Sequence, residues 1–343
     1  DITQTPIPRW DLIRMKDYAL MPMQFSRGCP FNCEFCDIII MNGRIPRVKT
    51  APQMIAELEA LVSAGWKGSV FIVDDNFIGN RVKAHELLEA IVAWRENHKV
   101  PLVFTTEASL NLADYPELLD LMARAGFRKV FVGIETPAEE SLLECAKVQN
   151  TQRDLIGAVR TIQNSGIEVM GGFIVGFDSD GPNIFQQQLE FIQQSGIVTA
   201  MVGILTALPG TRLWQRLQAE GRILRESTGN NFEGVVNFVP RLDCDALVQG
   251  YRSLVRHLYQ PKNYYDRVLC FLGEFKPRKS PFWRWPEIVA VFKAMWVMGL
   301  WNRGRRAYWA FLGRVLLRHP RAFADAITLA IVGHHFRRVA QSV

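Results

Sequence analysis

Short apolar segments alternate with helical patterns through residues 21–222, and this alternation limits the folds that the chain can adopt. We count six strand-then-helix units in this region. Strands that are joined through helices run parallel to one another and are covered by those helices. The expected strands are residues 21–26, 69–73, 102–106, 129–134, 168–175 and 198–205.

Polar residues follow several of these strands. The segment Asp74-Asp75-Asn76 follows the second strand, and Glu107 and Glu135 end the third and fourth. Barrel enzymes keep their chemistry at the carboxyl ends of parallel strands. The pattern therefore predicts an α/β fold class, a partial (β/α)6 TIM-like barrel of parallel strands. The alternative is an open doubly wound sheet, which needs a switch point that the pattern does not locate.

The alternation ends near residue 222, and the rest of the chain predicts an all-helical extension. Asp243 can cap one helix and Pro261 can start the next, and a Pro-rich hinge covers residues 275–286. The predicted parts are a linker arm at 1–20, a core barrel at 21–225, and a C-terminal helical domain at 226–343 with a basic, Trp-rich tail.

Three cysteines lie in the loop after the first expected strand, in a C-x3-C-x2-C pattern formed by Cys29, Cys33 and Cys36. Three thiols within eight residues can converge on one metal centre, whereas disulfide pairing would leave one over. Iron–sulfur clusters are usually held by four thiolates. A trio without a nearby fourth therefore indicates a 4Fe-4S cluster with one iron open to a substrate or cofactor.

Two other uses of the cysteines are disfavoured. A structural zinc site usually needs four Cys or His ligands in paired knuckles, and all six histidines are remote from this loop. A disulfide framework is unexpected because Cys145, Cys244 and Cys270 are scattered singly in a chain of 343 residues. This cysteine usage suits the cytoplasm, and no apolar run reaches the ~18–20 residues that span a bilayer.

The cysteine motif, with an aromatic Phe35 before its third cysteine, resembles the signature of the radical S-adenosylmethionine (radical SAM) superfamily. In that family the open iron chelates the amino and carboxylate groups of S-adenosylmethionine. The similarity covers about residues 20–275 and is to a bacterial branch that includes enzymes modifying hopanoid lipids, such as the C-2 methylase. Proteins of this branch normally carry an N-terminal cobalamin-binding domain and a C-terminal helical domain. The runs that carry it are residues 24–30, 73–80, 106–111 and 171–178.

The resemblance implies cofactor contacts at the barrel mouth. Phe35 would lie near the adenine, the backbone of the segment Asp74–Asn76 would meet the methionyl amino group, and Glu135 is favoured over Glu107 for the ribose hydroxyls. The family's common Gly-Gly-Glu is here Asp-Asp-Asn, and each acid could instead cap the following helix. No residue is assigned a catalytic role. The residues expected to bind the cofactor are Phe35, Asp74, Asp75, Asn76, Glu107, Glu135, Gly172 and Gly176.

The resemblance also implies a reaction: reductive cleavage of S-adenosylmethionine at a 4Fe-4S cluster to a 5′-deoxyadenosyl radical. With cobalamin, the chain would methylate a small-molecule or lipid-like substrate, using an electron donor such as flavodoxin or ferredoxin. The alternatives are a cobalamin-independent radical oxidoreductase or lyase, and a non-catalytic metal-stabilised membrane or partner adaptor. Residues 1–20 are too short for a cobalamin domain and resemble the linker that follows one, so we expect a truncated form.

The tail at residues 281–343 is strongly basic and rich in Trp. It holds ten Lys and Arg against two acids, a net charge of +8, which leaves about −2 for the first 280 residues, and it holds five of the nine tryptophans. The tail could be a helical cap on the barrel or a peripheral contact with the inner face of the membrane. Nucleic-acid binding is the least favoured of the three.

Overall fold

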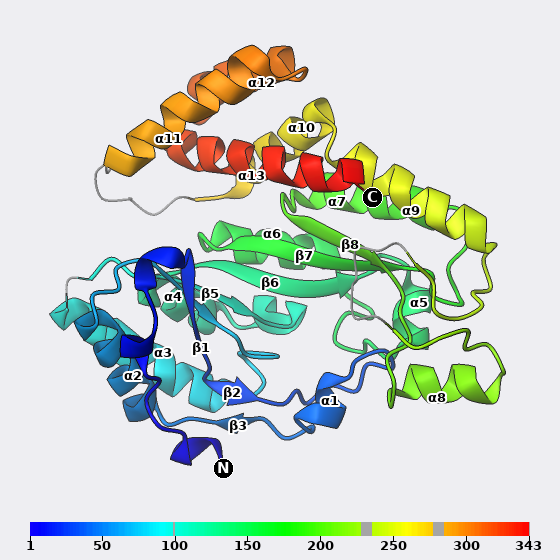
Figure 1. Cartoon of the computed structure of the whole chain (residues 1–343), viewed down its shortest axis with the longest axis horizontal. Helices are drawn as coiled ribbons and strands as arrows, with labels where there is room; N and C mark the ends of the chain where they lie inside the picture. The colour runs from blue at the N-terminus through cyan, green and yellow to red at the C-terminus, as the bar shows by residue number, and fades with distance from the viewer. Residues whose placement is uncertain (99, 228–234, 277–284, 343) are drawn as a thin grey trace.

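The computed structural model describes residues 1–98, 100–227, 235–276 and 285–342, and one sheet of six parallel strands forms its centre (Figure 1). Every strand pairs with the next one along the chain, in the order β1-β4-β5-β6-β7-β8. This order has no switch point, so the partial (β/α)6 barrel is confirmed and the doubly wound alternative is wrong. The strands are β1 Leu20–Met23, β4 Ser69–Ile72, β5 Val103–Glu107, β6 Phe127–Glu135, β7 Glu168–Val175 and β8 Ala200–Ile204.

Helices follow the strands, and several begin at capping residues. Thr50 caps the helix after the cysteine loop, because its hydroxyl accepts from the Gln53 backbone while the Gln53 side chain accepts from the Thr50 backbone. Thr211 caps the last barrel helix, because its hydroxyl accepts from the Trp214 backbone N–H. The barrel helices are α1 Ile38–Met41, α2 Ala51–Ser63, α3 Arg81–Asn97, α4 Pro116–Ala125, α5 Glu139–Glu144, α6 Leu155–Asn164, α7 Ile184–Ser195 and α8 Arg212–Ala219.

The first strand is shorter than the sequence predicts. It ends at Met23, and the next residues form β2 Ser26–Arg27, which pairs antiparallel with β3 Arg47–Val48. The buried Asp74 carboxylate accepts the backbone N–H groups of Phe25 and Ser26, at 2.8 and 2.9 Å. These bonds replace the ladder bonds of β1, so the chain leaves the sheet just before the cysteines. The arm at residues 1–20 contains no α-helix, only the 3₁₀ turns η1 Ile2–Gln4, η2 Trp10–Leu12 and η3 Met15–Asp17.

The C-terminal helices form a layer over α6, α7 and β8 (Figure 1). Asp243 caps α9 through the Ala246 backbone, and Pro261 begins α10, as predicted. Most of the predicted Pro-rich hinge lies outside the described residues. The elements are α9 Cys244–Leu258, α10 Pro261–Glu274, α11 Trp285–Trp296, the π-helical η5 Val297–Trp301, α12 Arg305–Arg318, η6 Pro320–Ala322 and α13 Phe323–Ser342.

The outer edge of the sheet is closed by this helical layer. The Tyr259 hydroxyl donates to the carbonyl of Ala200 on β8 at 2.7 Å and accepts from its N–H at 3.2 Å. The fully buried Arg267 donates to the carbonyl of Val198, just before the same strand. Edge strands need such partners because their free backbone groups otherwise pair with other chains. The helical layer thus docks on the barrel as the sequence suggested, while the domain boundary at 225/226 stays a prediction.

Candidate functional site

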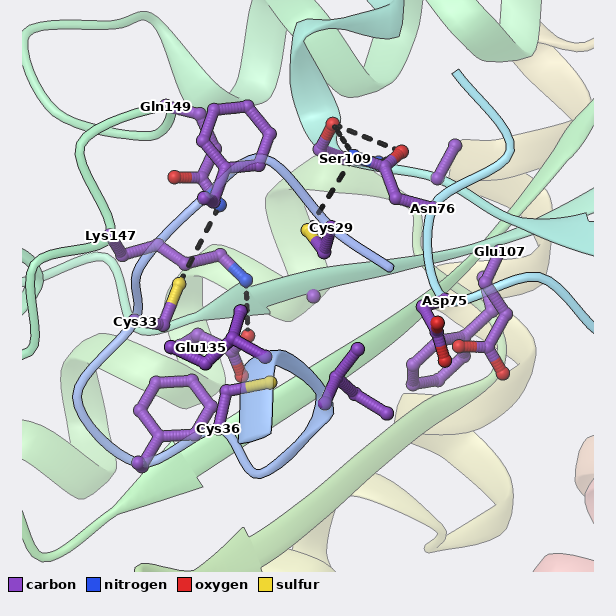
Figure 2. A pocket seen from close by; sticks show the side chains of 17 residues that line it. Cys29, Cys33, Cys36, Asp75, Asn76, Glu107, Ser109, Glu135, Lys147 and Gln149 are labelled. Atoms are coloured by element: carbon purple, nitrogen blue, oxygen red, sulfur yellow. Dashed lines mark hydrogen bonds and ion pairs between the residues drawn. The ribbon is translucent and has the colours of Figure 1, made fainter. Parts of the chain in front are cut away.

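A pocket of about 190 Å³ opens at the carboxyl ends of the strands (Figure 2). Its walls come from the cysteine loop, from the ends of β4, β5 and β6, and from the loop after α5. This is the end of the barrel where the sequence predicted the chemistry. The lining residues are Cys29, Phe31, Cys33, Phe35, Cys36, Ile38, Ile39, Asp75, Asn76, Glu107, Ala108, Ser109, Phe131, Gly133, Glu135, Lys147 and Gln149.

The cysteine loop is held in place by its own backbone. Gly28 has φ +101°, and a Cβ there would lie 2.8 Å from the carbonyl oxygen of Gly43, so only glycine fits. The N–H of Gly28 donates to the Asp75 carboxylate at 2.8 Å, and the N–H of Cys29 donates to the Gly43 carbonyl. The first cysteine is therefore fixed against the end of β4 before any ligand binds.

The donor set at the pocket is three thiols, the ligand type of iron–sulfur clusters. Burial raises the pKa of the Cys29 thiol and raises that of Cys36 to about 11, so these thiols need a cationic centre to ionise. Within the described residues, no three His, Cys, Asp or Glu side chains are arranged to hold one metal ion. Thiolates that bind separate irons of a cluster stand further apart than ligands of one ion. The three sulfurs lie around one pocket, as the ligands of a multi-iron cluster would (Figure 2).

The three residues of the Asp-Asp-Asn segment after β4 make different contacts. Asp74 accepts from Ser26 Oγ at 2.7 Å in addition to two backbone N–H groups, and it does not line the pocket. Asn76 donates to Ser109 Oγ at 3.1 Å and lies 3.9 Å from Cys29 Sγ. The segment thus braces the first cysteine, and only Asp75 and Asn76 face the ligand space.

Glu107 lies beside Asp75 at one side of the pocket (Figure 2). Burial and the neighbouring carboxylates of Asp75 and Asp74 raise the pKa of Glu107 to about 7. Among the described residues, no hydrogen bond or ion pair reaches its carboxylate. This side of the pocket is therefore rich in acceptors and suits a ligand that brings donors or positive charge.

Glu135 lies at the other side and is already paired. Its Oε1 atom is 2.6 Å from Lys147 Nζ, and both side chains are buried, at 9% and 10% exposure. Glu135 has φ +66°, where the register between β6 and β7 shifts. Burial opposes the charge of Lys147, but Glu135 and Cys33 outweigh it and the pKa of Lys147 is raised. Lys147 Nζ also lies 6.0 Å from the centre of the Phe35 ring.

An ion-pair network anchors the far side of the cysteine loop. Arg216 on α8 lies 2.8 Å from the carboxylate of Glu34, the residue after Cys33, and 2.7 Å from Asp178 after β7. Arg222 binds Asp178 at 2.5 Å. The cysteine loop is thus held by residues that follow β7 and β8 as well as by Asp75, which follows β4.

The structure brings together most, but not all, of the predicted site residues. The three cysteines, Phe35, Asp75, Asn76, Glu107 and Glu135 line the pocket, whereas three predicted residues do not: Asp74, Gly172 and Gly176. A Cβ at Gly172 would lie 2.8 Å from the Phe131 ring, and Gly176 has φ +103° and donates to Asp180. Their cofactor contacts stay predictions, because packing and backbone conformation account for both glycines.

Sequence reasoning missed Ser109, Phe131, Lys147 and Gln149. Gln149 Nε2 lies 3.8 Å from Cys33 Sγ, and its buried Oε1 has no hydrogen-bond partner within the described residues. Lys147 and Gln149 lie in a loop with no periodic pattern. Ser109 lies within residues 106–111, one of the runs that carry the family resemblance, so it is the one of the four that the sequence could have indicated.

The fold and the pocket define a barrel protein with three thiols at the mouth of parallel strands. Residues 23–192 match the family model described as "Radical SAM superfamily", and residues 211–343 match a domain of unknown function, DUF4070. The chain belongs to the radical SAM superfamily, whose members bind a 4Fe-4S cluster and S-adenosylmethionine. The recognition made from the cysteine motif is confirmed.

Two curated relatives match nearly the whole chain. An uncharacterised methyltransferase of Synechocystis sp. is 42% identical over 100% of this chain, and the hopanoid C-2 methylase of Rhodopseudomonas palustris is 37% identical over 98%. The chain spans 65% and 64% of the length of these relatives. The solved structure of the radical S-adenosylmethionine methyltransferase TsrM of Kitasatospora setae, with cobalamin and a [4Fe-4S] cluster bound, has a TM-score of 0.56 at 17% identity, over 92% of this chain and 61% of that one. That likeness supports the fold alone.

Proposed function

We propose that this chain is the catalytic core of a cobalamin-dependent radical SAM methyltransferase that acts on a hydrophobic, lipid-like substrate. The observation that carries the proposal is the pocket, which places three motif cysteines opposite Glu107, a carboxylate with no partner among the described residues. The names of the two relatives, a methyltransferase and a hopanoid methylase, favour methyl transfer and a lipid substrate.

The pocket residues divide between the two cofactors of the family. Cys29, Cys33 and Cys36 would hold the cluster, and S-adenosylmethionine would lie between the acceptors Asp75 and Glu107 and the paired Glu135. When bound, these cofactors supply a 5′-deoxyadenosyl radical through one-electron reductive cleavage. Glu107 would accept hydrogen bonds from ligand donors, while Phe35 and Phe131 would exclude water from the reacting end.

The proposal also includes a methyl donor, an electron donor and a cellular location. The branch that the cysteine motif resembles normally carries a cobalamin-binding domain, and TsrM, which shares the fold, was solved with cobalamin bound. In our proposal cobalamin is the source of the transferred methyl group. The electron would come from a donor such as flavodoxin or ferredoxin. A lipid-like substrate favours work at the inner face of a membrane, although no helix of the described residues is long and apolar enough to cross one.

The first experiment tests cleavage. The chain is reconstituted anaerobically with iron, sulfide and a chemical reductant, and 5′-deoxyadenosine is measured after S-adenosylmethionine is added. Cys33→Ala should reduce product by about a hundredfold or more, because a cluster ligand is lost. The matched control is Cys244→Ala, since that thiol is exposed and outside the pocket. Equal product from Cys33→Ala and the parent chain would refute the proposal.

The second experiment separates the competing functions. Methylated product is measured with squalene-type and hopanoid lipids, with and without added methylcobalamin. Product only with methylcobalamin supports the proposal, and 5′-deoxyadenosine with other substrate-derived products supports a cobalamin-independent oxidoreductase or lyase. One zinc per chain and no iron would instead indicate a non-catalytic adaptor.

A further inference from the structure

The helix formed by α11 and η5 turns apolar side chains to the outside. Phe292 and Trp296 are exposed, at 68% and 60%, and the residues that follow on the same side of η5, Leu300 and Trp301, are exposed as well. The side that packs inward holds the buried Ala294 and Met298. A helix that exposes several of its largest apolar side chains has an unfilled contact on its outer side.

Helix α12 also exposes large apolar side chains. Leu317 is 86% exposed, and Trp309 and Leu316 are exposed on the same side. The core contact of this helix is already made by other residues, because Phe311 stacks on Tyr265 of α10 with ring centres 4.7 Å apart. The exposed side chains are therefore additional to those that hold the helix on the protein.

The two exposed surfaces are continuous. The indole N–H of Trp309 on α12 donates to the carbonyl of Gly299 in η5 at 3.0 Å, so this side chain joins the helices. Figure 1 shows α11 and α12 at the outer limit of the helical layer, with α10 and α13 between them and the barrel. We name the exposed set the apolar face: Phe292, Trp296, Val297, Leu300, Trp301, Trp309, Leu316 and Leu317.

Positive charge surrounds the apolar face. Residues 288–324 contain seven Lys and Arg and neither Asp nor Glu. Arg305 and Arg306 are exposed at the start of α12, Arg318 is exposed at its end, and Arg321 is exposed in the following η6. An apolar centre rich in Trp and Leu with arginines at its ends is the pattern of helices that lie in a membrane interface.

We propose that the apolar face docks on the surface of a lipid bilayer that contains anionic headgroups. The charge argues for this occupant, because a second copy of the chain would bring arginines against arginines. Nucleic acid would match the charge but leave the Trp and Leu side chains without an apolar partner. Docking does not require the proposed methyl transfer, and it would place a lipid-like substrate beside the protein that uses it.

The test is flotation of the full chain with lipid vesicles, without added cofactor. The vesicles are phosphatidylcholine alone, or phosphatidylcholine with phosphatidylglycerol. The chain should float with the anionic vesicles and much less with the neutral ones, and added salt should weaken binding because it screens the arginines. The double variant Trp301→Asp, Leu317→Asp should bind at least about tenfold more weakly, since it places charge in the interface.

The matched control is Leu12→Asp with Val82→Asp, two side chains of similar exposure, 72% and 68%, outside the apolar face. Both double variants should keep the parent's thermal unfolding midpoint and its 5′-deoxyadenosine formation, which separates this test from that of the proposed function. Failure of the parent to float, or equal flotation of the apolar-face variant, would overturn docking. A dimer in light scattering that only the apolar-face variant disrupts would assign the surface to self-association instead.

Discussion

The two sides of the pocket each carry a glutamate, but only one of the two has a cationic partner among the described residues. Glu107 ends β5 next to Asp75 and has no cationic partner among the described residues, and its pKa is raised to about 7. Glu135 ends β6 and is held by Lys147 at 2.6 Å. Both are carboxylates at the carboxyl ends of neighbouring strands, yet only the first has free acceptor capacity for a ligand.

The difference shows that position in the fold does not decide the role of a strand-end acid. A buried carboxylate needs a partner, and either the protein or a ligand can supply it. Where the chain supplies the partner, as Lys147 does, removal of that partner should affect folding. Where it does not, as at Glu107, removal of the carboxylate should affect ligand binding and leave folding intact.

The largest effect is expected at the paired side. Lys147→Met leaves Glu135 buried and unpaired, which should lower the free energy of unfolding by about 3–5 kcal/mol. Adding Glu135→Gln should restore most of that loss, because no buried charge then remains. Denaturant unfolding of the cofactor-free chain measures both. The exposed Lys83, paired with Glu86, is the control, and Lys83→Met should change stability by less than about 1 kcal/mol. Equal losses in the two single variants would mean that the Lys147 pair is not structural.

The Arg216 network should give a smaller loss of stability. Its guanidinium is 30% exposed while the Glu34 and Asp178 carboxylates are 13% and 10% exposed, so Arg216→Gln should lower the free energy of unfolding by about 2 kcal/mol. Because Glu34 follows Cys33, a chelator should also remove iron faster from the reconstituted variant. The control is Arg160→Gln, which removes a longer and more exposed ion pair with Glu274. If Arg216→Gln lost iron no faster than the parent, the network would not be what holds the cysteine loop in place.

On the unpaired side, Glu107→Gln should weaken binding of S-adenosylmethionine by about tenfold, the effect of one lost charge-assisted hydrogen bond. Anaerobic titration calorimetry of the reconstituted protein measures the dissociation constant. The control is Glu117→Gln on α4, an exposed carboxylate outside the pocket. A loss of folding stability with unchanged binding would reverse the comparison and make Glu107 the structural acid.

The smallest effect concerns pH. The folded pKa of Glu107 lies above its ordinary value of 4.5, so the folded chain holds a proton that the unfolded chain loses. Ionisation of Glu107 should therefore lower the free energy of unfolding of the cofactor-free chain progressively as pH rises from about 4.5 to about 7. Between pH 5.5 and 8, the free energy of unfolding of the parent should fall by about 1 kcal/mol more than that of Glu107→Gln. This figure is lower than the full pKa shift implies, because solvent partly screens the carboxylate. Denaturation midpoints at both pH values measure this difference, and parallel pH profiles would contradict it.

Local patterns predicted much of the fold and of the site. Periodicity located the strands, and the helices predicted to begin at Asp243 and Pro261 are present there. The error at β1 arose because a long-range bond from Asp74 draws residues 25 and 26 out of the sheet. Lys147 could not be predicted, because its loop has no period and its partner is twelve positions away.

The C-terminal helices show the same limit. Their Trp and Arg content is visible in the sequence, and it indicated a cap or a membrane contact. Which side chains face outward depends on packing against α10 and α13: Phe311 stacks on Tyr265 of α10, whereas Leu316 and Leu317 are exposed.

The sequence by itself determined the parallel barrel, the cysteine trio and the superfamily, because these depend on periodicity and on spacing within a few residues. Only the tertiary structure decided which acids are free. Asp74 is used by the backbone of the cysteine loop, Glu135 by Lys147, and Glu107 by no described side chain. The physical reason is that a carboxylate's charge state is set by its neighbours in space, and the fold brings those neighbours from distant parts of the chain.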